Sequence, residues 1–186
     1  MVPDILVRQL ASFVQTGSAD LPIHRPVDND ITLSVMRRAK ASGFTALVVT
    51  LDTIIIGWRP HDLAASYLPF VHGVGSQVGL SDPVFMKKHG EEPILDVPAF
   101  PYDPHRMDRL YEQGDEKVRR TMKMAAKWIQ QTNSGKFNTW EDLKFIRDNW
   151  DGPLILKGIL DVEVSDMAVR GHTTLAQMSE GCRNGY

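Results

Sequence analysis

Four polar or charged side chains stand within or just after two short apolar runs of the sequence. Thr50 and Asp52 close the first run, Arg59 follows seven residues after Asp52, and Lys157 lies inside the second run. A lysine within an apolar strand is unfavourable to bury unless its charge is used. Lys157 could form a Schiff base if desolvation lowers its pKa, or it could hold an anion.

The other three side chains suit complementary roles. Asp52 could orient a histidine or act as the counter-ion of Lys157. Arg59 has the planar guanidinium that binds a substrate carboxylate, and Thr50 offers one hydroxyl. Each residue alone also has an ordinary interpretation, as a turn, a solvent-reaching lysine or a surface arginine. Opposite charges at the ends of two strands favour a site.

A helix and a glycine precede each apolar run. We expect Asp30 to cap a helix over 31–42, with Gly43 just beyond its end. Thr139 and Asp142 form a capping-box pattern for a second helix, which Gly152-Pro153 ends. Helix, glycine and short apolar strand, used twice, predict an α/β fold with a parallel sheet covered by helices. Chemistry in such folds lies at the carboxyl ends of the strands.

Residues 57–104, between these two units, predict a long loop. They hold seven of the eleven prolines and five glycines, without clear periodicity. His61 and His72 lie in this loop, and we expect both to be solvated. Two helices are expected after it, over 104–113 and over 116–131.

Composition restricts the class of protein. The chain has 186 residues, of which 42% are hydrophobic and 24% charged, which predicts one globular domain. A net charge of -2 gives no electrostatic case for nucleic acid or an anionic membrane. The single cysteine, Cys182, excludes an internal disulfide, and the N-terminus is a poor signal peptide. We expect an intracellular, cytoplasmic location, with an organelle as the alternative.

The segment "TLDTIIIGWRPHDL" at 50–63 resembles the FMN-dependent 2-hydroxy acid oxidase and dehydrogenase family. That family includes glycolate oxidase, flavocytochrome b2 and lactate 2-monooxygenase, and the form of this segment is most similar to the last branch. The segments 38–50 and 139–159 resemble the family's helix–strand units around strands four and five. The resemblance covers residues 27–160, between a divergent N-terminal segment (1–26) and a divergent C-terminal tail (161–186).

The resemblance implies a partial TIM (β/α)8 barrel, with a long loop after the strand ending at Asp52. It implies an FMN cofactor and oxidation of a small, lactate-like 2-hydroxy acid to the 2-keto acid. Thr50 and Lys157 would bind the flavin, and Arg59 would hold the substrate carboxylate. Asp52 would support the catalytic histidine. The resemblance leaves an oligomer open, since full-length relatives often form tetramers.

The sequence also departs from the family's pattern. The family places its histidine in a Ser-Asn-His-Gly-Gly-Arg-Gln segment after strand six, and this segment is absent; His172 stands in a different motif. The Gln-x-Tyr of strand three is replaced by the sequence around "DLPIHRPVDND". With two convincing strands, we expect a fragment, from an altered reading frame or a remnant gene. A catalytically inactive remnant is therefore the alternative to an active enzyme, and a Schiff-base barrel enzyme is a third interpretation.

Overall fold

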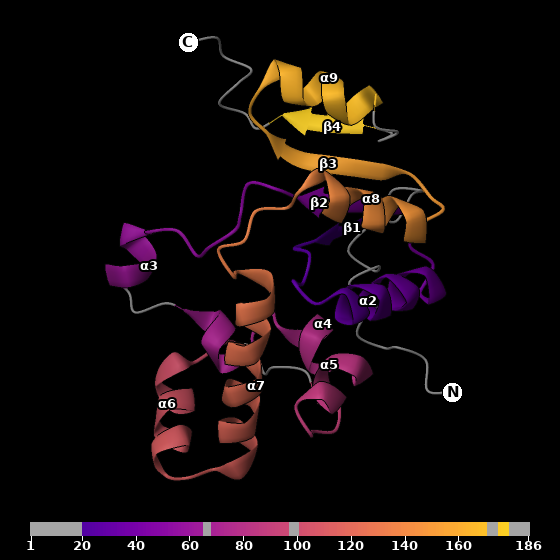
Figure 1. Ribbon diagram of the computed structural model, residues 1–186. Helices are drawn as coiled ribbons and strands as arrows, with labels where there is room; N and C mark the ends of the chain where they lie inside the picture. Colours follow the sequence, from indigo (N-terminus) through magenta and orange to yellow (C-terminus); the bar gives the residue numbers. More distant parts are fainter. Residues whose placement is uncertain (1–19, 65–67, 97–100, 171–174, 179–186) are drawn as a thin grey trace. The chain divides into compact units, whose positions relative to one another are not determined.

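The computed structural model describes residues 20–64, 68–96, 101–170 and 175–178. Its sheet has four strands, β1 (Asp20–Ile23), β2 (Ala46–Thr50), β3 (Leu154–Ile159) and β4 (Leu175–Met178), in that spatial order (Figure 1). All neighbouring strands are parallel. Helices α2 (Asn29–Ala41), α8 (Trp140–Asn149) and α9 (Val162–Arg170) precede β2, β3 and β4 respectively. The predicted α/β class with a parallel sheet is confirmed.

The expectation of only two strands is wrong. β1 lies within the segment 1–26, and α9 and β4 lie within 161–186. Both added strands have four residues, and β1 contains Pro22, so neither carries a clear sequence signal. Pairing with β2 and β3 defines these strands, and no local pattern reports such pairing. His172 and Cys182 lie outside the described residues.

The cap predicted for α8 is confirmed, and the cap predicted for α2 is wrong by two residues. Thr139 and Asp142 form the predicted capping box of α8, with N···O distances of 3.2 and 3.0 Å. Asp28, and not Asp30, caps α2, because its carboxylate accepts from the backbone N–H groups of Asp30 and Ile31. The extended backbone ends at Asp28, so the helix begins two residues earlier than expected. Gly43 adopts φ +90° beyond the end of α2, as predicted.

Alternate residues of the strands differ in burial. The core side is lined by side chains that are at most 6% exposed, namely Leu21, Ile23, Leu47, Val49, Leu154 and Leu156. On the other side, Pro22 is exposed, and Val48 and Ile155 are half-buried. Since register partners in a parallel sheet share a face, Pro22, Val48 and Ile155 form one row across β1, β2 and β3. This more open face continues towards the carboxyl ends of the strands.

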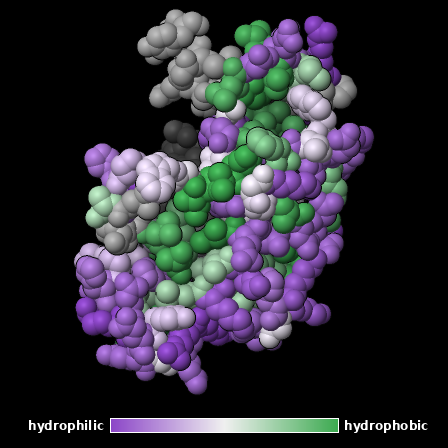
Figure 2. Space-filling view, turned by 60° about the vertical axis from the view of Figure 1, so that its left-hand side comes forward, coloured by the Kyte–Doolittle hydropathy of each residue, from purple (hydrophilic) through white to green (hydrophobic). Residues whose placement is uncertain are grey.

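Apolar side chains remain exposed at α9. Leu160, just before this helix, is 63% exposed, and Val162 and Met167 are 68% and 52% exposed. Figure 2 shows hydrophobic residues at the surface near the top of the molecule, at the height where Figure 1 places α9. Within the described part of the chain, α9 thus keeps an uncovered apolar face.

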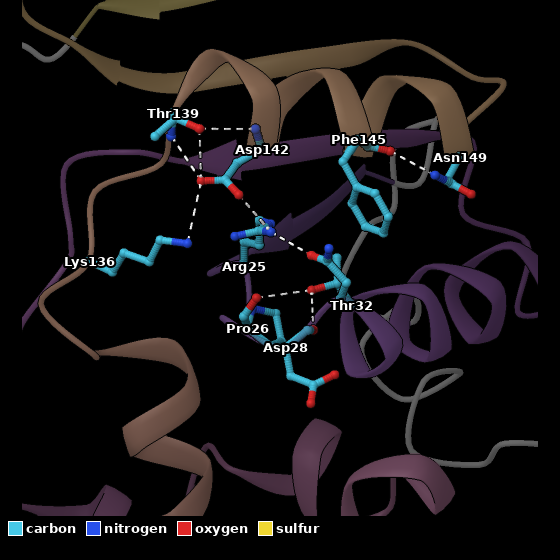
Figure 3. A network of polar contacts seen from close by, with 10 residues as sticks. Arg25, Pro26, Asp28, Thr32, Lys136, Thr139, Asp142, Phe145 and Asn149 are labelled. Atoms are coloured by element: carbon cyan, nitrogen blue, oxygen red, sulfur yellow. Dashed lines mark hydrogen bonds and ion pairs between the residues drawn. The ribbon is translucent and has the colours of Figure 1, made fainter.

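A buried ion pair joins the loop after β1 to the start of α8 (Figure 3). The Arg25 side chain is 3% exposed, and its Nη2 lies 2.9 Å from Oδ1 of Asp142. The same Nη2 donates to Asn29 of α2 at 2.7 Å. Asp142 therefore caps its own helix and also fixes the loop that leads from β1 into α2.

Residues 57–132 form a second compact unit, inserted between β2 and α8. It contains α3 (Pro60–Ala64), the 3-10 helix η1 (Pro69–His72), α4 (Gln77–Leu80), α5 (Pro83–Lys88), α6 (Pro104–Glu112) and α7 (Glu116–Thr132). Phe85 and Trp128 pack edge to face, with ring centroids 5.3 Å apart, and both are buried. The prediction of a long loop over 57–104 is therefore wrong, because helices of four to six residues are too short to show periodicity.

The two helices expected after this segment are confirmed as α6 and α7. Asp115 accepts from the backbone N–H of Val118 at 2.9 Å, as a cap should. His61 is exposed as predicted, but His72 is only 7% exposed. Its Nε2 lies 2.8 Å from Asp108 of α6, and its Nδ1 contacts Tyr102. The expectation that His72 is solvated is wrong, because these contacts come from residues 30 or more positions away.

Candidate functional site

The carboxyl ends of β2 and β3 bring two of the predicted site residues together. Thr50 and Lys157 are register partners on these neighbouring parallel strands. The backbone N–H of Leu51 also donates to the carbonyl of Lys157 at 2.9 Å, so pairing continues one residue beyond the end of β2. Thr50 is buried, and Lys157 is half-buried with its side chain 39% exposed. Both residues lie on the same face of the sheet as Val48 and Ile155.

Asp52 forms the predicted ion pair with Lys157. The ammonium Nζ lies 3.1 Å from Oδ1 and 3.2 Å from Oδ2, so it donates to both carboxylate oxygens. Desolvation raises the pKa of Asp52, but the hydrogen bonds and charge of Lys157 outweigh it, and the pKa lies below its ordinary value. The Thr53 hydroxyl also donates to Oδ1 at 3.3 Å. The carboxylate is therefore held ionised beside a cation at the strand edge.

Gly158 makes this ion pair sterically possible. It has φ +94°, and a Cβ built on it would lie 2.4 Å from Cγ of Asp52. A contact that short is forbidden, so any larger residue here would displace the carboxylate. Gly158 follows Lys157 directly in the apolar run, and a glycine inside a strand pattern was the available signal for a close approach.

Arg59 belongs to the second compact unit. Its guanidinium lies 3.6 Å from Asp62 and is 62% exposed, and the neighbouring Trp58 is 85% exposed. The structure thus joins Thr50, Asp52 and Lys157 in one cluster and pairs Arg59 with a different carboxylate.

His24 is a neighbour of this cluster that the sequence did not single out. It follows β1 directly, and Ile23 is the register partner of Val49, so His24 stands level with Thr50. Desolvation lowers the pKa of His24 below its ordinary value, a hydrogen bond with the Thr53 backbone raises it, Lys157 lowers it and Asp52 raises it. His24 therefore feels both charges of the ion pair. No pattern in the sequence singles out His24, because six histidines without ligand spacing look alike.

Among the described residues, no group of three histidine, cysteine or acidic side chains could hold a metal ion. None of the helices in the described ranges is long and apolar enough to cross a membrane. What the strand edge offers is a hydroxyl, an ammonium, a carboxylate and an imidazole.

Polar groups at the carboxyl ends of parallel strands that are joined by helices are typical of α/β folds of the barrel or open-sheet type. The family model described as FMN-dependent dehydrogenase matches residues 9–176. The chain belongs to this family, and the match extends on both sides of the range 27–160 that the motifs delimited.

Individual relatives agree with this assignment. The chain is 36% identical over 154 residues to an FMN-dependent alpha-hydroxy acid dehydrogenase of Penicillium citrinum, covering 82% of this chain and 33% of the relative. It is 38% identical over 142 residues to one of Schizosaccharomyces pombe, covering 75% and 30%. An L-lactate dehydrogenase of Vibrio parahaemolyticus is 32% identical over 143 residues, covering 77% and 35%. The chain thus spans about a third of the length of these relatives.

Solved structures agree on the fold. A mandelate oxidase crystal structure matches with a TM-score of 0.54 at 19% identity, covering 94% of this chain and 39% of that one. The parallel, unclosed sheet of the described residues corresponds to part of the fold of this mandelate oxidase. The predicted partial barrel is confirmed.

The strand-edge residues fit one edge of a flavin. The pyrimidine edge of FMN presents a carbonyl oxygen and a ring nitrogen that accept hydrogen bonds. The Lys157 ammonium and the Thr50 hydroxyl are adjacent donors on neighbouring strands, and they match that chemistry. The partly exposed Lys157 side chain leaves room for a second acceptor beside Asp52.

Proposed function

We propose that this chain supplies part of an FMN-dependent 2-hydroxy acid oxidoreductase, which converts a small hydroxy acid to the 2-keto acid. One observation carries the proposal: Thr50 and Lys157 are register partners at the carboxyl edge of the sheet, and Lys157 pairs with Asp52 there. The family match and the FMN-dependent relatives support the same cofactor. FMN, when bound, supplies the two-electron acceptor that the oxidation needs.

Each residue has a specific role in this proposal. Lys157 would hold the N1–C2 carbonyl edge of the flavin and stabilise negative charge there, and Thr50 would donate to the ring. Arg59 holds the substrate carboxylate with its guanidinium. Asp52 keeps Lys157 in place and would orient the catalytic histidine of the family, whose motif is absent from this sequence. The pairing of Lys157 with Asp52 supports the first of these roles, because it fixes the ammonium at the strand edge.

We infer a lactate-like substrate. The motif 50–63 is of the lactate 2-monooxygenase type, and L-lactate dehydrogenases and an L-lactate oxidase are among the relatives.

Two alternatives remain to be tested beside this proposal. A Schiff-base enzyme needs Lys157 as a neutral nucleophile, and its hydrogen bonds to both oxygens of Asp52 favour the charged form. Borohydride trapping with pyruvate should therefore leave no adduct on Lys157. The inactive remnant, the second alternative, would bind neither flavin nor substrate.

Titration of FMN with the full chain tests the proposal, because flavin fluorescence is quenched on binding. Lys157→Met should weaken FMN binding about tenfold or more, since a hydrogen bond from a charged donor contributes about 1.5–3 kcal/mol. Lys40→Met is the matched control. Lys40 pairs with Asp151 at 2.5 Å in the same unit, but it lies near the end of α2, before β2 begins.

FMN binding that falls with Lys157→Met and not with Lys40→Met supports the proposal. Saturable binding that both variants retain would place the flavin elsewhere. No binding by the folded wild-type chain, with folding checked by circular dichroism, would favour the remnant.

A further inference from the structure

His72 is a buried histidine of the second compact unit, at the end of η1. Its side chain is 7% exposed, and Gly73, which follows it, adopts φ +88°. A Cβ built on Gly73 would lie 2.7 Å from Cγ2 of Thr121, so the end of η1 packs closely against α7. The backbone that carries His72 is therefore fixed against this helix, and the position of its ring is limited accordingly.

Both ring nitrogens of His72 have a partner. Nε2 lies 2.8 Å from Oδ1 of Asp108 in α6, and Nδ1 forms a hydrogen bond with the hydroxyl of Tyr102, two residues before that helix begins. The centroids of the two rings are 5.8 Å apart. An ionised carboxylate only accepts hydrogen bonds, so Nε2 carries the ring hydrogen. In the neutral ring, Nδ1 then keeps its lone pair and accepts from the Tyr102 hydroxyl.

Carboxylate, imidazole and hydroxyl are thus joined in the order that activates a nucleophile through a general base. An ordinary phenol has a pKa of about 10, so it is almost entirely protonated at neutral pH and attacks slowly. A base that accepts the hydroxyl proton during the attack accelerates it. Tyr102 is half-buried and the Asp108 side chain is 55% exposed, so the cluster is open to solvent and to small reagents.

We propose that Tyr102 is an acyl-accepting nucleophile, with His72 as its general base and Asp108 as the residue that positions the imidazole. The ligand class is an activated acyl donor, an aryl ester or a thioester. In the balanced step, the Tyr102 oxygen bonds to the acyl carbon, and the bond from that carbon to the leaving oxygen or sulfur breaks with its electron pair. The hydroxyl proton moves to Nδ1 of His72 and passes from there to the leaving group or to solvent.

This site is independent of the flavin site. Tyr102, His72 and Asp108 all belong to the unit of residues 57–132, whereas Thr50 and Lys157 belong to the sheet-containing unit. The acyl transfer uses no flavin and no hydroxy acid. A chain that fails to bind FMN can therefore still acylate at Tyr102, and a chain that fails to acylate can still bind FMN.

Acetylation of the full chain by p-nitrophenyl acetate at neutral pH tests the proposal. Mass spectrometry of peptides measures the rate of acetylation at each tyrosine. Tyr111 is the matched control, because it is a 45% exposed phenol of α6 whose ring centroid lies 5.4 Å from Cζ of Arg119, in place of a histidine. Neutral hydroxylamine removes an acetyl group from a phenol and leaves acetyl-lysine intact, so it separates tyrosine from lysine labelling.

Tyr102 should be acetylated at least about 100-fold faster than Tyr111, within the range of general-base effects. His72→Gln should lower the Tyr102 rate to that of Tyr111. Asp108→Asn retains an oxygen that accepts from Nε2, so a merely structural role predicts an unchanged rate. Loss of the carboxylate charge should instead slow Tyr102 at least about tenfold, because a charged acceptor forms the stronger hydrogen bond.

Either of two results would overturn the proposal. In the folded wild-type chain, Tyr102 could react no faster than Tyr111, and this comparison requires no variant. Tyr102 could also react fast and keep its rate in His72→Gln, with folding checked by circular dichroism. If His72→Gln does not fold, the surface substitution Asp108→Asn decides between a retained and a lowered rate.

Discussion

Removing the Asp142 carboxylate should strongly destabilise the sheet-containing unit. Asp142 is the ionic partner of Arg25, whose side chain is 3% exposed, and the two charged atoms lie 2.9 Å apart (Figure 3). Arg25 also donates to Asn29, while its Nε has no partner within the described residues. Asp142→Ala therefore removes the carboxylate partner of the buried Arg25 guanidinium, which keeps its hydrogen bond to the neutral amide oxygen of Asn29.

The expected loss combines two effects. Breaking a buried ion pair by removing one partner costs about 3–5 kcal/mol, because the remaining charge is uncompensated. Loss of the capping-box carboxylate adds about 1 kcal/mol. The sum, about 4–6 kcal/mol, is comparable with the total stability of many domains, about 5–15 kcal/mol. The variant should therefore be largely unfolded at urea concentrations that the wild type tolerates.

Urea denaturation followed by circular dichroism and by fluorescence of the buried Trp150 measures this loss. Asp148→Ala is the matched control, because Asp148 lies on the same helix and pairs with Lys144 at the surface. Asp148→Ala should lower the free energy of unfolding by less than about 0.5 kcal/mol. Arg25→Met combined with Asp142→Ala should recover much of the loss, since an apolar replacement of a buried pair is often neutral.

Either of two results would refute this reasoning. The free energy of unfolding of Asp142→Ala could lie within about 1 kcal/mol of the wild-type value, which would mean that other groups compensate the Arg25 charge. The double variant could instead be no more stable than the single one, which means that the stranded charge is not the cause.

The lowered pKa of Asp142 also predicts how the stability of the protein depends on pH. Desolvation raises the pKa of Asp142, but the hydrogen bond from the Thr139 backbone and the charge of Arg25 outweigh it, and the pKa lies below 3.8. A lowered folded-state pKa gives stability that is present above the ordinary value and is lost as the pH falls through the folded value. Between pH 7 and pH 3, Asp142→Ala should therefore lose less stability than the wild type.

Two glycine substitutions give further predictions. Gly158→Ala should weaken FMN binding more than Gly43→Ala. Both glycines have φ near +90°, but only a Cβ at 158 would collide, at 2.4 Å from Asp52. Equal effects of the two substitutions in the FMN titration would contradict the role of Gly158. Gly79→Ala should destabilise the second unit by about 1–3 kcal/mol in urea, because its Cβ would lie 2.0 Å from the buried ring of Trp128, and an unchanged midpoint would show that the ring moves freely.

Much of the fold around the site follows from local patterns in the sequence. The capping box at Thr139 and the glycine at 43 mark helix ends by hydrogen bonds and backbone angles within a few residues. The apolar runs of β2 and β3 were also evident, because each is a short continuous run within the sequence. The motif 50–63 and the lysine at 157 were sufficient to indicate the family and to predict that Lys157 and Asp52 meet.

Long-range packing decided the remainder. β1 and β4 have four residues each and are defined by their pairing with β2 and β3. His72 contacts Tyr102 and Asp108, at least 30 positions away, and Phe85 packs on Trp128, more than 40 positions away. The place of His24 beside Asp52 and Lys157 also depends on strand register. Residue type and spacing thus indicated the family, and strand pairing brought the ends of β1, β2 and β3 to one edge, because the sheet joins residues 24, 52 and 157 that no local interaction connects.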